Sequence, residues 1–491
     1  MKNGFTSSIV RRDGEISDEL EASKLHPLLK KIYANRGVTS LKQVDYSLKG
    51  LLDFSLLKDI DVAAELVSEA IIEDKRIVVV GDFDADGATS CAVMMRSLRA
   101  FGLSKVEYLV PNRFDFGYGL SPQIVDVAAG SEPDLIITVD NGISSIDGVR
   151  RANELGIQVV VTDHHLAADV LPEAVAIVNP NQPHCEFPSK VIAGVGVAFY
   201  LMLAVRARLR DKDWFAKDMA RVEPNMANYL DLVALGTVAD VVPLDENNRI
   251  LVESGLQRIR KNKACAGINA LLTIAGKSIE GCSSQDFGFI IGPRLNAAGR
   301  LDDMSIGIEC LLCDDYEQAF KHASTLNHMN QQRRQIEGEM LDQAYDILNH
   351  QMSLLDDEDR VPDALALYDE QWHQGVVGLL ASRIKEKYHR PVIAFADAGG
   401  GELKGSGRSI PGLHMRDVLD VISKKHTGMI EKFGGHAMAA GLSIKQENFS
   451  GFRSAFNDHV SALLRPEDLN NCLLYTSDAA DEYQRGEFSG G

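Results

Sequence analysis

The hydrophobic pattern between residues 76 and 161 alternates between short apolar runs and longer amphipathic segments. Four short runs rich in valine and isoleucine are typical of buried parallel strands, at 76–80, 106–110, 135–139 and 158–161. The segments after the first three runs carry apolar residues at helical spacing, over 88–101, 121–129 and 144–154. This alternation predicts an α/β fold with a doubly wound parallel sheet.

The pattern on either side of this region is mostly helical. Two helical stretches precede the sheet, at 25–37 and 62–75, and buried helices are predicted at 193–209 and 229–238. Residues 292–300 contain two glycines and a proline, and we interpret them as a loop. The segment 316–350 has no proline and a single glycine, so it predicts one long exposed helix.

A second, smaller α/β unit is predicted after the long helix, beyond an acidic stretch at 356–362. Its pattern is a strand, a helix, a strand and two glycine-rich loops, at 364–368, 376–387, 391–395, 404–409 and 433–441. We therefore expect a large domain at 1–315 with an N-terminal helical segment, a connecting helix at 316–350 and a small domain at 351–462. Residues from about 471 onward show no periodicity, and we expect the tail at 463–491 to be foreign to the natural protein.

Composition narrows the class of protein. A chain of 491 residues with 45% hydrophobic and 25% charged residues is typical of a soluble protein with two or three domains. The N-terminus lacks the apolar core of a signal peptide, and the longest apolar run, 191–205, is shorter than the roughly 20 residues of a membrane span. The seven cysteines form no framework, and Cys310 and Cys313 have no second pair, so we interpret both as core residues of a cytoplasmic protein.

The net charge of −19 argues against a protein that coats nucleic acid, because such binding depends on neutralising phosphates. A polyanionic substrate would need a local basic groove and metal ions.

Acidic side chains follow several of the predicted strands at the point where each strand ends. Asp82, Asp84 and Asp86 follow the first strand, Asp140 follows the third, and Asp163 follows the fourth. Because the carboxyl ends of parallel strands meet at one edge of a sheet, these side chains are expected to converge. The alternative is an acidic turn that only caps the helix after the first strand.

Further candidate ligands accompany these acids. His164 and His165 follow Asp163, and Asp240 ends the apolar helix at 229–238, where an ionised carboxylate is costly without a cation. A set rich in carboxylates with a little imidazole does not suit structural zinc. It suits two hard cations bridged by a carboxylate and a water, of the kind that promotes phosphoryl transfer, and Mn²⁺ tolerates imidazole better than Mg²⁺ does.

Basic and glycine-rich segments are candidates for phosphate binding. Arg294, Asn296 and Arg300 lie in the predicted loop at 292–300, which is either a phosphate-binding loop or a polar turn. Arg408 and His436 accompany the two glycine-rich loops, whose backbones could approach a ligand closely, although most such loops are only turns. Trp372 is either a base-stacking residue or a core residue.

These motifs together resemble the DHH phosphoesterase family. The sequence contains DFDADG at 82–87, VDNG at 139–142, DHH at 163–165 and VALGTVADVVPL at 233–244, in the order of that family. The segments PNRFDFGYGLS, GPRLNAAGRLDD, WHQGVVG, GSGRSIPG and FGGHAMAAG are similar to those of its single-stranded-DNA exonucleases. The resemblance runs from about residue 25 to residue 460 and implies a DHH catalytic domain followed by a DHHA1 substrate-binding domain.

The resemblance also implies roles for individual residues. The metal ligands would be Asp82, Asp84, Asp86, Asp140, His164 and Asp240, with Asp82 either a ligand or a neighbour of one. Asp163 would orient a neighbouring group, and His165 would contact the scissile phosphate. The implied phosphate-binding or DNA-binding positions are Arg113, Arg294, Asn296, Arg300, Arg408, Gly435 and His436.

The implied activity is a two-metal exonuclease, using Mn²⁺ or Mg²⁺, that degrades single-stranded DNA from its 5′ end to mononucleotides in recombination and repair. Its partners would be single-stranded DNA, a single-strand-binding protein and a helicase, with no membrane, and the protein would be a cytoplasmic monomer. The oligonucleotide-binding barrel that follows the DHHA1 domain in this family is expected to be absent here.

Two alternatives remain at this point. The first is another DHH enzyme, such as an oligoribonuclease, a cyclic dinucleotide phosphodiesterase or an inorganic pyrophosphatase. The second is a catalytically silent binding subunit on the same fold. The length of the chain, the long helix and the arginine-containing segments favour a polymeric substrate, and the intact motifs argue against a silent subunit.

Overall fold

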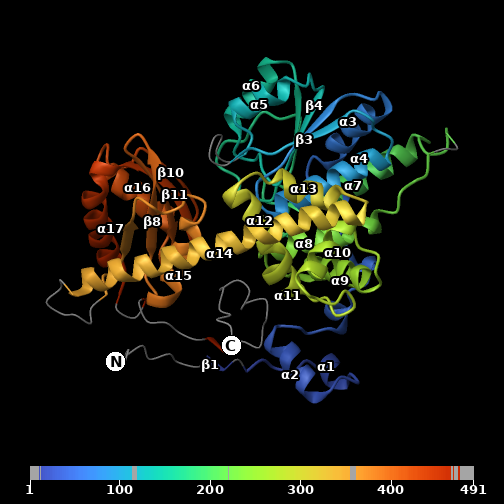
Figure 1. Cartoon of the computed structure of the whole chain (residues 1–491). Helices are drawn as coiled ribbons and strands as arrows, with labels where there is room; N and C mark the ends of the chain where they lie inside the picture. Colours follow the sequence, from blue (N-terminus) through green and yellow to red (C-terminus); the bar gives the residue numbers. More distant parts are fainter. Residues whose placement is uncertain are drawn as a thin grey trace. The chain divides into compact units, whose positions relative to one another are not determined.

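The computed structural model describes residues 10–11, 13–112, 119–218, 221–353, 361–465, 468 and 474–475 (Figure 1). Contacts divide the chain into two units: Asp13–Asn330, and Gln331–Tyr475 together with strand β1 (Val10–Arg11). The long helix α14 (Tyr316–Ser353) crosses this division and confirms the helix predicted at 316–350. No helix within these described ranges is both long and apolar enough to cross a membrane.

The first unit is built on a five-stranded parallel sheet with the strand order β3-β2-β4-β5-β6. The strands are β2 (Ile77–Val80), β3 (Val106–Leu109), β4 (Leu135–Val139), β5 (Gln158–Thr162) and β6 (Ala176–Val178). The four predicted strands are confirmed. The fifth strand was not predicted, because a run of three residues before Asn179 and Pro180 is too short to show a pattern.

Helices cover both faces of this sheet, which confirms the doubly wound arrangement (Figure 1). Ile77 and Val79 pack in one core with α3 (Ile60–Ile72), α4 (Ala85–Ala100) and α7 (Gly194–Asp211). Val78 and Val80 pack in another core with α5 (Pro122–Ala129) and α6 (Ile146–Glu154). Burial on both faces explains why these strands are continuously apolar rather than alternating.

The strand order places a switch point between β2 and β4. Counted along the chain the order is 2-1-3-4-5, so the connections leave β2 and β4 toward opposite edges of the sheet. Sites in open α/β sheets form at the carboxyl ends of the strands on either side of such a switch. Asp82 follows β2 and Asp140 follows β4, so both acids lie at this position.

Further helices complete the first unit. They are α1 (Asp18–Ala22), α2 (Pro27–Asn35), α8 (Leu230–Ala239), α9 (Glu246–Arg260), α10 (Ala266–Ile274), α11 (Ser284–Asp286), α12 (Gly292–Leu301) and α13 (Ser305–Leu312). Single turns at Leu41–Val44, Leu48–Gly50, Phe54–Leu56 and Met226–Tyr229 and a π-helix at Phe287–Ile291 connect them. Helix α8 is buried and packs against α4 and α9.

The loop predicted at 292–300 is wrong, because these residues form helix α12. Pro293 directly follows the π-helix at Phe287–Ile291, and it lacks the N–H that would continue the hydrogen-bond ladder, so the proline lies where the helix changes its pitch. Gly299 serves packing: a β-carbon at this position would lie 1.9 Å from the backbone oxygen of Phe83. The glycine therefore allows α12 to press against the segment that carries Asp82 and Asp84.

The second unit contains a mixed sheet with the order β10-β11-β9-β8-β7. The strands are β7 (Leu365–Tyr368), β8 (Val392–Gly399), β9 (Glu402–Arg408), β10 (Lys432–Gly435) and β11 (Ala439–Lys445). Within this sheet β7 and β8 pair in parallel, and its other described strand pairs are antiparallel. The helices are α15 (Val377–Tyr388), α16 (Met415–Lys425) and α17 (Phe449–Leu463), so the strands and the helix predicted at 364–395 are confirmed.

The two glycine-rich loops predicted in this unit are wrong. Residues 404–408 lie in β9, and 433–441 belong to the hairpin of β10 and β11. A β-carbon at Gly405 would lie 2.5 Å from the Phe395 ring and 2.7 Å from the Leu442 side chain. Glycine therefore makes room for its neighbours within the sheet, a use that the sequence pattern does not distinguish from a loop.

Two ambiguous residues are resolved as parts of the core. Trp372 is 3% exposed, and its indole Nε1 donates to Gln343 Oε1 at 2.9 Å, so the base-stacking alternative is wrong. Cys310 is buried in α13, in line with its interpretation as a core residue. In the predicted tail, Leu474–Tyr475 form β12, which pairs in parallel with β1, and most of its other residues lie outside the described part of the chain.

Replacing glycine with alanine should have opposite effects on stability at a tightly packed position and at an open one. A β-carbon at Gly255 in α9 would lie 2.2 Å from the Leu230 backbone oxygen, whereas one at Gly338 in α14 would meet nothing within 4 Å. We expect Gly255→Ala to lower the free energy of unfolding by about 1–3 kcal/mol through overpacking. Gly338→Ala should raise it by about 0.5–1 kcal/mol through helix propensity. Denaturant unfolding measures both, and an unchanged midpoint for Gly255→Ala would contradict the tight contact.

Candidate metal centre

Three carboxylates lie between the end of β2 and the first turn of α4. Asp84 is the N-cap of α4, and its Oδ1 accepts a hydrogen bond from the Gly87 amide at 3.0 Å. Asp82 and Asp86 are buried. A β-carbon at Gly87 would lie 2.4 Å from the Asp82 backbone oxygen, so glycine is required for this compact turn.

The N-terminus of α7 holds Asp86. Its Oδ2 accepts from the Gly194 amide at 2.7 Å, and its Oδ1 accepts from the Val195 amide at 2.9 Å. Amide groups at a helix N-terminus carry partial positive charge and stabilise a carboxylate. A β-carbon at Gly194 would lie 2.5 Å from Asp140 Oδ1, so the same glycine lets two acids approach one helix end.

Asp140 lies directly after β4 with a left-handed backbone, at φ 61°. The neighbouring Asn141 is fully buried, and its Nδ2 donates to the backbone oxygens of Val80 at 3.1 Å and Val139 at 2.9 Å. The Asn141 amide thus ties together the ends of β2 and β4, and fixes the distance between the acids that follow them.

The Asp163-His164-His165 segment follows β5. Asp163 Oδ2 accepts from the Ile143 amide at 2.9 Å, and its Oδ1 lies 2.7 Å from His165 Nδ1. His164 points to the acids: its Nε2 lies 3.1 Å from Asp140 Oδ1, 3.5 Å from Asp240 Oδ2 and 3.9 Å from Asp86 Oδ2. The ends of β4 and β5, the first turn of α4 and the C-terminal end of α8 therefore meet at His164.

Potential ligand atoms form three overlapping groups, in each of which they lie within 4.8 Å of one another. The groups are Asp82, Asp84 and Asp140; Asp86, His164 and Asp240; and Asp140, His164 and His165. All six residues that the sequence predicts as ligands belong to these groups. The structure brings them together from β2, β4, β5, α4 and α8.

Burial and mutual repulsion determine the electrostatics of this centre. Burial, followed by the charge of Asp84, raises the pKa of Asp86 to about 7. Burial and the neighbouring acids raise the pKa values of Asp140 and Asp240 well above their usual range. Burial and the charge of His165 lower the pKa of His164 to about 4, so its imidazole is neutral near pH 7.

The Asp163–His165 pair behaves differently. Burial opposes ionisation of both groups, but the hydrogen bond and charge of His165 outweigh it and lower the pKa of Asp163. The same hydrogen bond to Asp163 outweighs burial and raises the pKa of His165 to about 9. His165 is therefore a half-exposed imidazolium held by a buried carboxylate.

This donor set fits divalent cations. Buried carboxylates that raise one another's pKa values are costly unless positive charge compensates them. His164 Nε2 and Asp240 Oδ2 are buried, and neither has a hydrogen-bond partner among the described residues. Carboxylate oxygens suit both Mn²⁺ and Mg²⁺, and Mn²⁺ tolerates the one neutral imidazole better than Mg²⁺ does.

Sequence comparisons agree with this geometry. The N-terminal domain of the DHH family matches residues 76–237, and the DHHA1 domain matches residues 362–462. The single-stranded-DNA-specific exonuclease RecJ of Dickeya dadantii is 55% identical over 459 residues, which cover 94% of this chain and 78% of the relative. RecJ of Escherichia coli is 54% identical, over 93% of this chain and 78% of the relative. The chain belongs to the RecJ family.

Solved structures of RecJ proteins share the fold. RecJ of Thermus thermophilus in complex with Mn²⁺ superposes with a TM-score of 0.75 at 31% identity, and the match covers 92% of this chain and 61% of that chain. An exonuclease RecJ bound to manganese gives a TM-score of 0.69 at 32% identity, over 85% of this chain and 97% of that chain. A Mg²⁺ complex of the Thermus protein is also similar, with a TM-score of 0.68. This chain thus spans about three fifths of the Thermus RecJ chain.

The residues predicted to bind phosphate lie in both units. In α12, Arg294 Nε donates to Asn327 Oδ1 at 3.0 Å, Asn296 Oδ1 accepts from the Ala85 amide at 2.7 Å, and Arg300 lies in the last turn. In the second unit, Arg408 ends β9, while Gly435 and His436 lie at the turn between β10 and β11. Arg113 lies outside the described residues.

Sequence reasoning missed the groups that position the ligands. The amides of Gly194 and Val195 hold Asp86 across 108 and 109 residues of sequence, and Asn141 connects the ends of two strands. Asn296 gives the N-terminus of α4 an additional acceptor. The one available signal was the Gly194-Val-Gly196 pair at the start of an apolar helix, where glycine is otherwise unfavourable.

The contact of Asn296 with α4 yields a prediction about metal affinity. Asn296→Ala should lower the stability of the metal-free protein by about 0.5–2 kcal/mol, as the loss of a helix cap does. It should also weaken Mn²⁺ binding by about ten- to a hundredfold, because α4 carries Asp86 and its N-cap Asp84. Calorimetric titration with Mn²⁺ and hydrogen exchange at the Ala85 amide measure these effects.

The matched control is Asn327→Ala, which removes an asparagine bound to Arg294 of α12 rather than to α4. Equal Mn²⁺ affinities in the two variants would show that Asn296 does not position the acidic turn.

Proposed function

We propose that this chain is a single-stranded-DNA-specific exonuclease that hydrolyses DNA from the 5′ end and releases mononucleotides. The observation that carries the proposal is the gathering of Asp82, Asp84, Asp86, Asp140, His164 and Asp240 at one sheet edge. The 55% identity to a protein named as a single-stranded-DNA-specific exonuclease supports the substrate. It also favours this activity over the other DHH enzymes and over a silent subunit.

The six clustered residues would hold two divalent cations, Mn²⁺ or Mg²⁺. When bound, such a pair supplies charge that stabilises a phosphoryl transition state and lowers the pKa of an attacking water. The role of the polypeptide is to keep the ligands in place. Asn141 fixes the strand ends, the amides of Gly194 and Val195 hold Asp86, and Asp84 stays at the N-terminus of α4.

His165 would contact the scissile phosphate in this proposal. Its Nδ1 is bound to Asp163, which fixes the ring orientation, and its side chain is 46% exposed at the edge of the cluster. Asp163 accepts from the Ile143 amide through its other oxygen, so it is itself fixed. Asp163 would therefore act as a positioning residue for His165.

Both units would contribute residues that bind the phosphates of the DNA strand. In the first unit, Arg294, Asn296 and Arg300 belong to α12, which presses against the acidic turn through Gly299. In the second unit, Arg408 lies beside the first turn of α15, since a β-carbon at Gly378 would be 3.0 Å from its Nη2. Guanidinium groups and helix N-termini both favour phosphate, and the glycine-rich hairpin at Gly435 and His436 would add backbone contacts.

Several further features belong to this proposal. The DHH domain would comprise residues 1–315, the connecting helix 316–350 and the DHHA1 domain 351–462. The protein would act in recombination and repair in the cytoplasm as a monomer, with a single-strand-binding protein and a helicase as partners.

A comparison of end-labelled strands tests the activity. With Mn²⁺, a 5′-labelled single strand should lose its label at once as a mononucleotide, whereas a 3′-labelled strand should pass through progressively shorter products. Duplex DNA should persist, and a chelator should stop hydrolysis because the ligands alone cannot activate water. Immediate release of a 3′ label would reverse the proposed polarity, and equal loss of duplex would refute the specificity.

Asp140→Asn is the matched variant for this experiment. Asparagine tolerates the left-handed backbone at this position and keeps the shape of the side chain against Gly194. Activity should fall by more than about a hundredfold, which is the upper end of the usual loss when a residue that only supports a metal ligand is removed. The melting temperature of the metal-free protein should stay equal or rise, because one of several buried like charges is removed. Unchanged turnover would remove Asp140 from the centre.

Salt dependence tests the DNA contact of α12. Arg300→Ala should weaken binding of single-stranded DNA in chelator, and the slope of log K against log salt should flatten by about 0.7 per lost phosphate contact. Arg150→Ala, which removes an exposed arginine paired with Asp147 on α6, is the control. An identical slope for Arg300→Ala and the unmodified protein would exclude Arg300 from the DNA path.

A further inference from the structure

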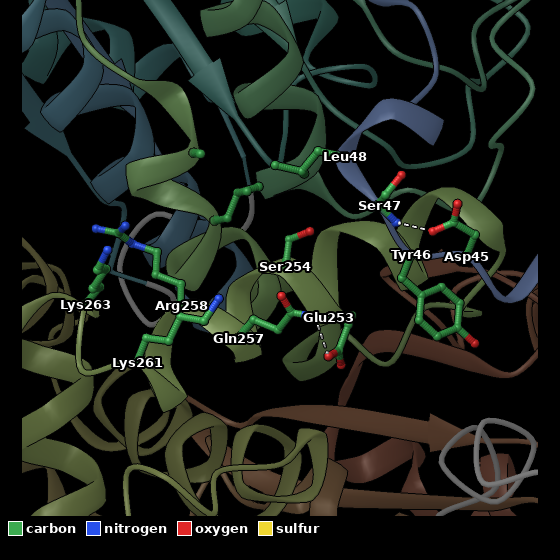
Figure 2. A pocket seen from close by; sticks show the side chains of 12 residues that line it. Asp45, Tyr46, Ser47, Leu48, Glu253, Ser254, Gln257, Arg258, Lys261 and Lys263 are labelled. Atoms are coloured by element: carbon green, nitrogen blue, oxygen red, sulfur yellow. Dashed lines mark hydrogen bonds between the residues drawn. The ribbon is translucent and has the colours of Figure 1, made fainter.

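A cavity of about 560 Å³ lies in the first unit at the N-terminal end of α8 (Figure 2). Its walls come from Asp45–Leu48, the start of α8 at Leu230, and the last two turns of α9 with the residues that follow. The metal centre lies at the other end of the same helix, where Asp240 is the C-cap. Helix α8 has 10 residues, so at 1.5 Å per residue the two sites are separated by about 15 Å.

Three cationic side chains gather on one side of this cavity: Arg258, Lys261 and Lys263 (Figure 2). Neither lysine forms an ion pair with any residue that the structure describes. Arg258 is held from behind, since its Nη1 donates to Asn228 Oδ1 at 3.1 Å and its Nε lies 3.7 Å from Asp231 Oδ1. The cavity therefore combines one fixed guanidinium, that of Arg258, with two lysine ammonium groups that form no ion pair with a described residue.

A simpler explanation is that these cations only compensate the dipole at the C-terminus of α9. The carbonyl groups at this end, however, already accept backbone amides. Lys261 N donates to Gln257 O, Asn262 N to Ile259 O and Lys263 N to Arg258 O. The lysine side chains are therefore not needed as caps of the helix.

The acidic residues of the cavity do not neutralise the lysines either. Glu253 accepts a hydrogen bond from Gln257 Nε2 at 3.1 Å and lies 3.5 Å from Arg260 Nη1. Asp45 accepts from the Ser47 amide at 3.1 Å. Both carboxylates thus have partners of their own, and Asp45 lies on the opposite side of the cavity from the three cations (Figure 2).

We propose that this cavity binds the phosphate group of a nucleotide, at a site separate from the metal centre. Arg258, Lys261 and Lys263 would contact the phosphate, and the Ser254 hydroxyl and the Gln257 amide supply further polar groups on the same helix. The apolar walls at Leu48, Ala227 and Leu230 suit a sugar or base. The volume lies within the range of about 300–1,000 Å³ that is usual for small-molecule sites.

The phosphate could come from a free mononucleotide or from a strand of nucleic acid, and the two sources share the same chemistry. The lining of the cavity carries three cations against the two carboxylates of Asp45 and Glu253, and this positive balance gives a local preference for anions in a chain of net charge −19. The proposal does not depend on the exonuclease activity, because none of the lining residues belongs to the metal centre.

Calorimetric titration in the presence of a chelator tests the site without contribution from bound metal or turnover. The probes are a deoxynucleoside monophosphate, inorganic phosphate, the matching deoxynucleoside and a short single-stranded oligonucleotide. The test variant is Lys261→Gln with Lys263→Gln, which removes two charges that hold no other described side chain. Lys321→Gln, at an exposed lysine of α14 without an ion pair among the described residues, is the control. Melting temperatures confirm that both variants fold.

The monophosphate should bind the unmodified protein and the control equally, and should bind the double variant about tenfold more weakly for each lysine removed. If only the oligonucleotide shows this loss, the ligand is a phosphate within a strand; if only the mononucleotide shows it, the ligand is a free nucleotide. Equal affinity for the phosphate-free deoxynucleoside, unchanged affinities in the double variant, or no binding of any probe would overturn the proposal.

Discussion

The crowding of negative charge at one edge of a parallel sheet is the constraint on which the catalytic unit depends. Asp86, Asp140 and Asp240 are brought within reach of one neutral imidazole, and burial makes their ionisation costly. The rest of the unit either offsets this charge or holds it in place. The helix α7 contributes its N-terminal amides, and Asn141 contributes a bridge between two strand ends.

Close backbone approach is the means by which this arrangement is built. At four glycines a β-carbon would lie 2.5 Å or less from another atom: Gly87, Gly194, Gly236 and Gly299. At Gly236 that atom is the Thr89 hydroxyl, with Asp86 Oδ1 at 2.9 Å, so α8 is pressed onto α4 at the centre itself. The short distances between these helices and turns therefore determine where the acidic side chains lie.

The sequence was sufficient to predict the sheet and the convergence of its acidic ends. Runs such as Ile77–Val80 are short and rich in β-branched residues, and parallel pairing then brings Asp82, Asp140 and Asp163 to one edge. It failed where glycine serves packing instead of a turn. Residues 292–300 and 404–409 were interpreted as loops, yet Gly299 makes room for Phe83 inside a helix and Gly405 makes room for Phe395 inside a strand. The holding of Asp86 by α7 could not be predicted either, because no local pattern records a contact across 108 residues.

The glycine contacts have a consequence for the portability of the centre. Grafting only the acids and the histidine onto another parallel sheet would not reproduce it, because a side chain at the position of Gly194 would push the helix start away from both Asp86 and Asp140. A transplant would have to carry the backbone of three helix ends as well as the ligands. The chemistry of this centre therefore depends on the distances between backbone segments as much as on the acidic motif itself.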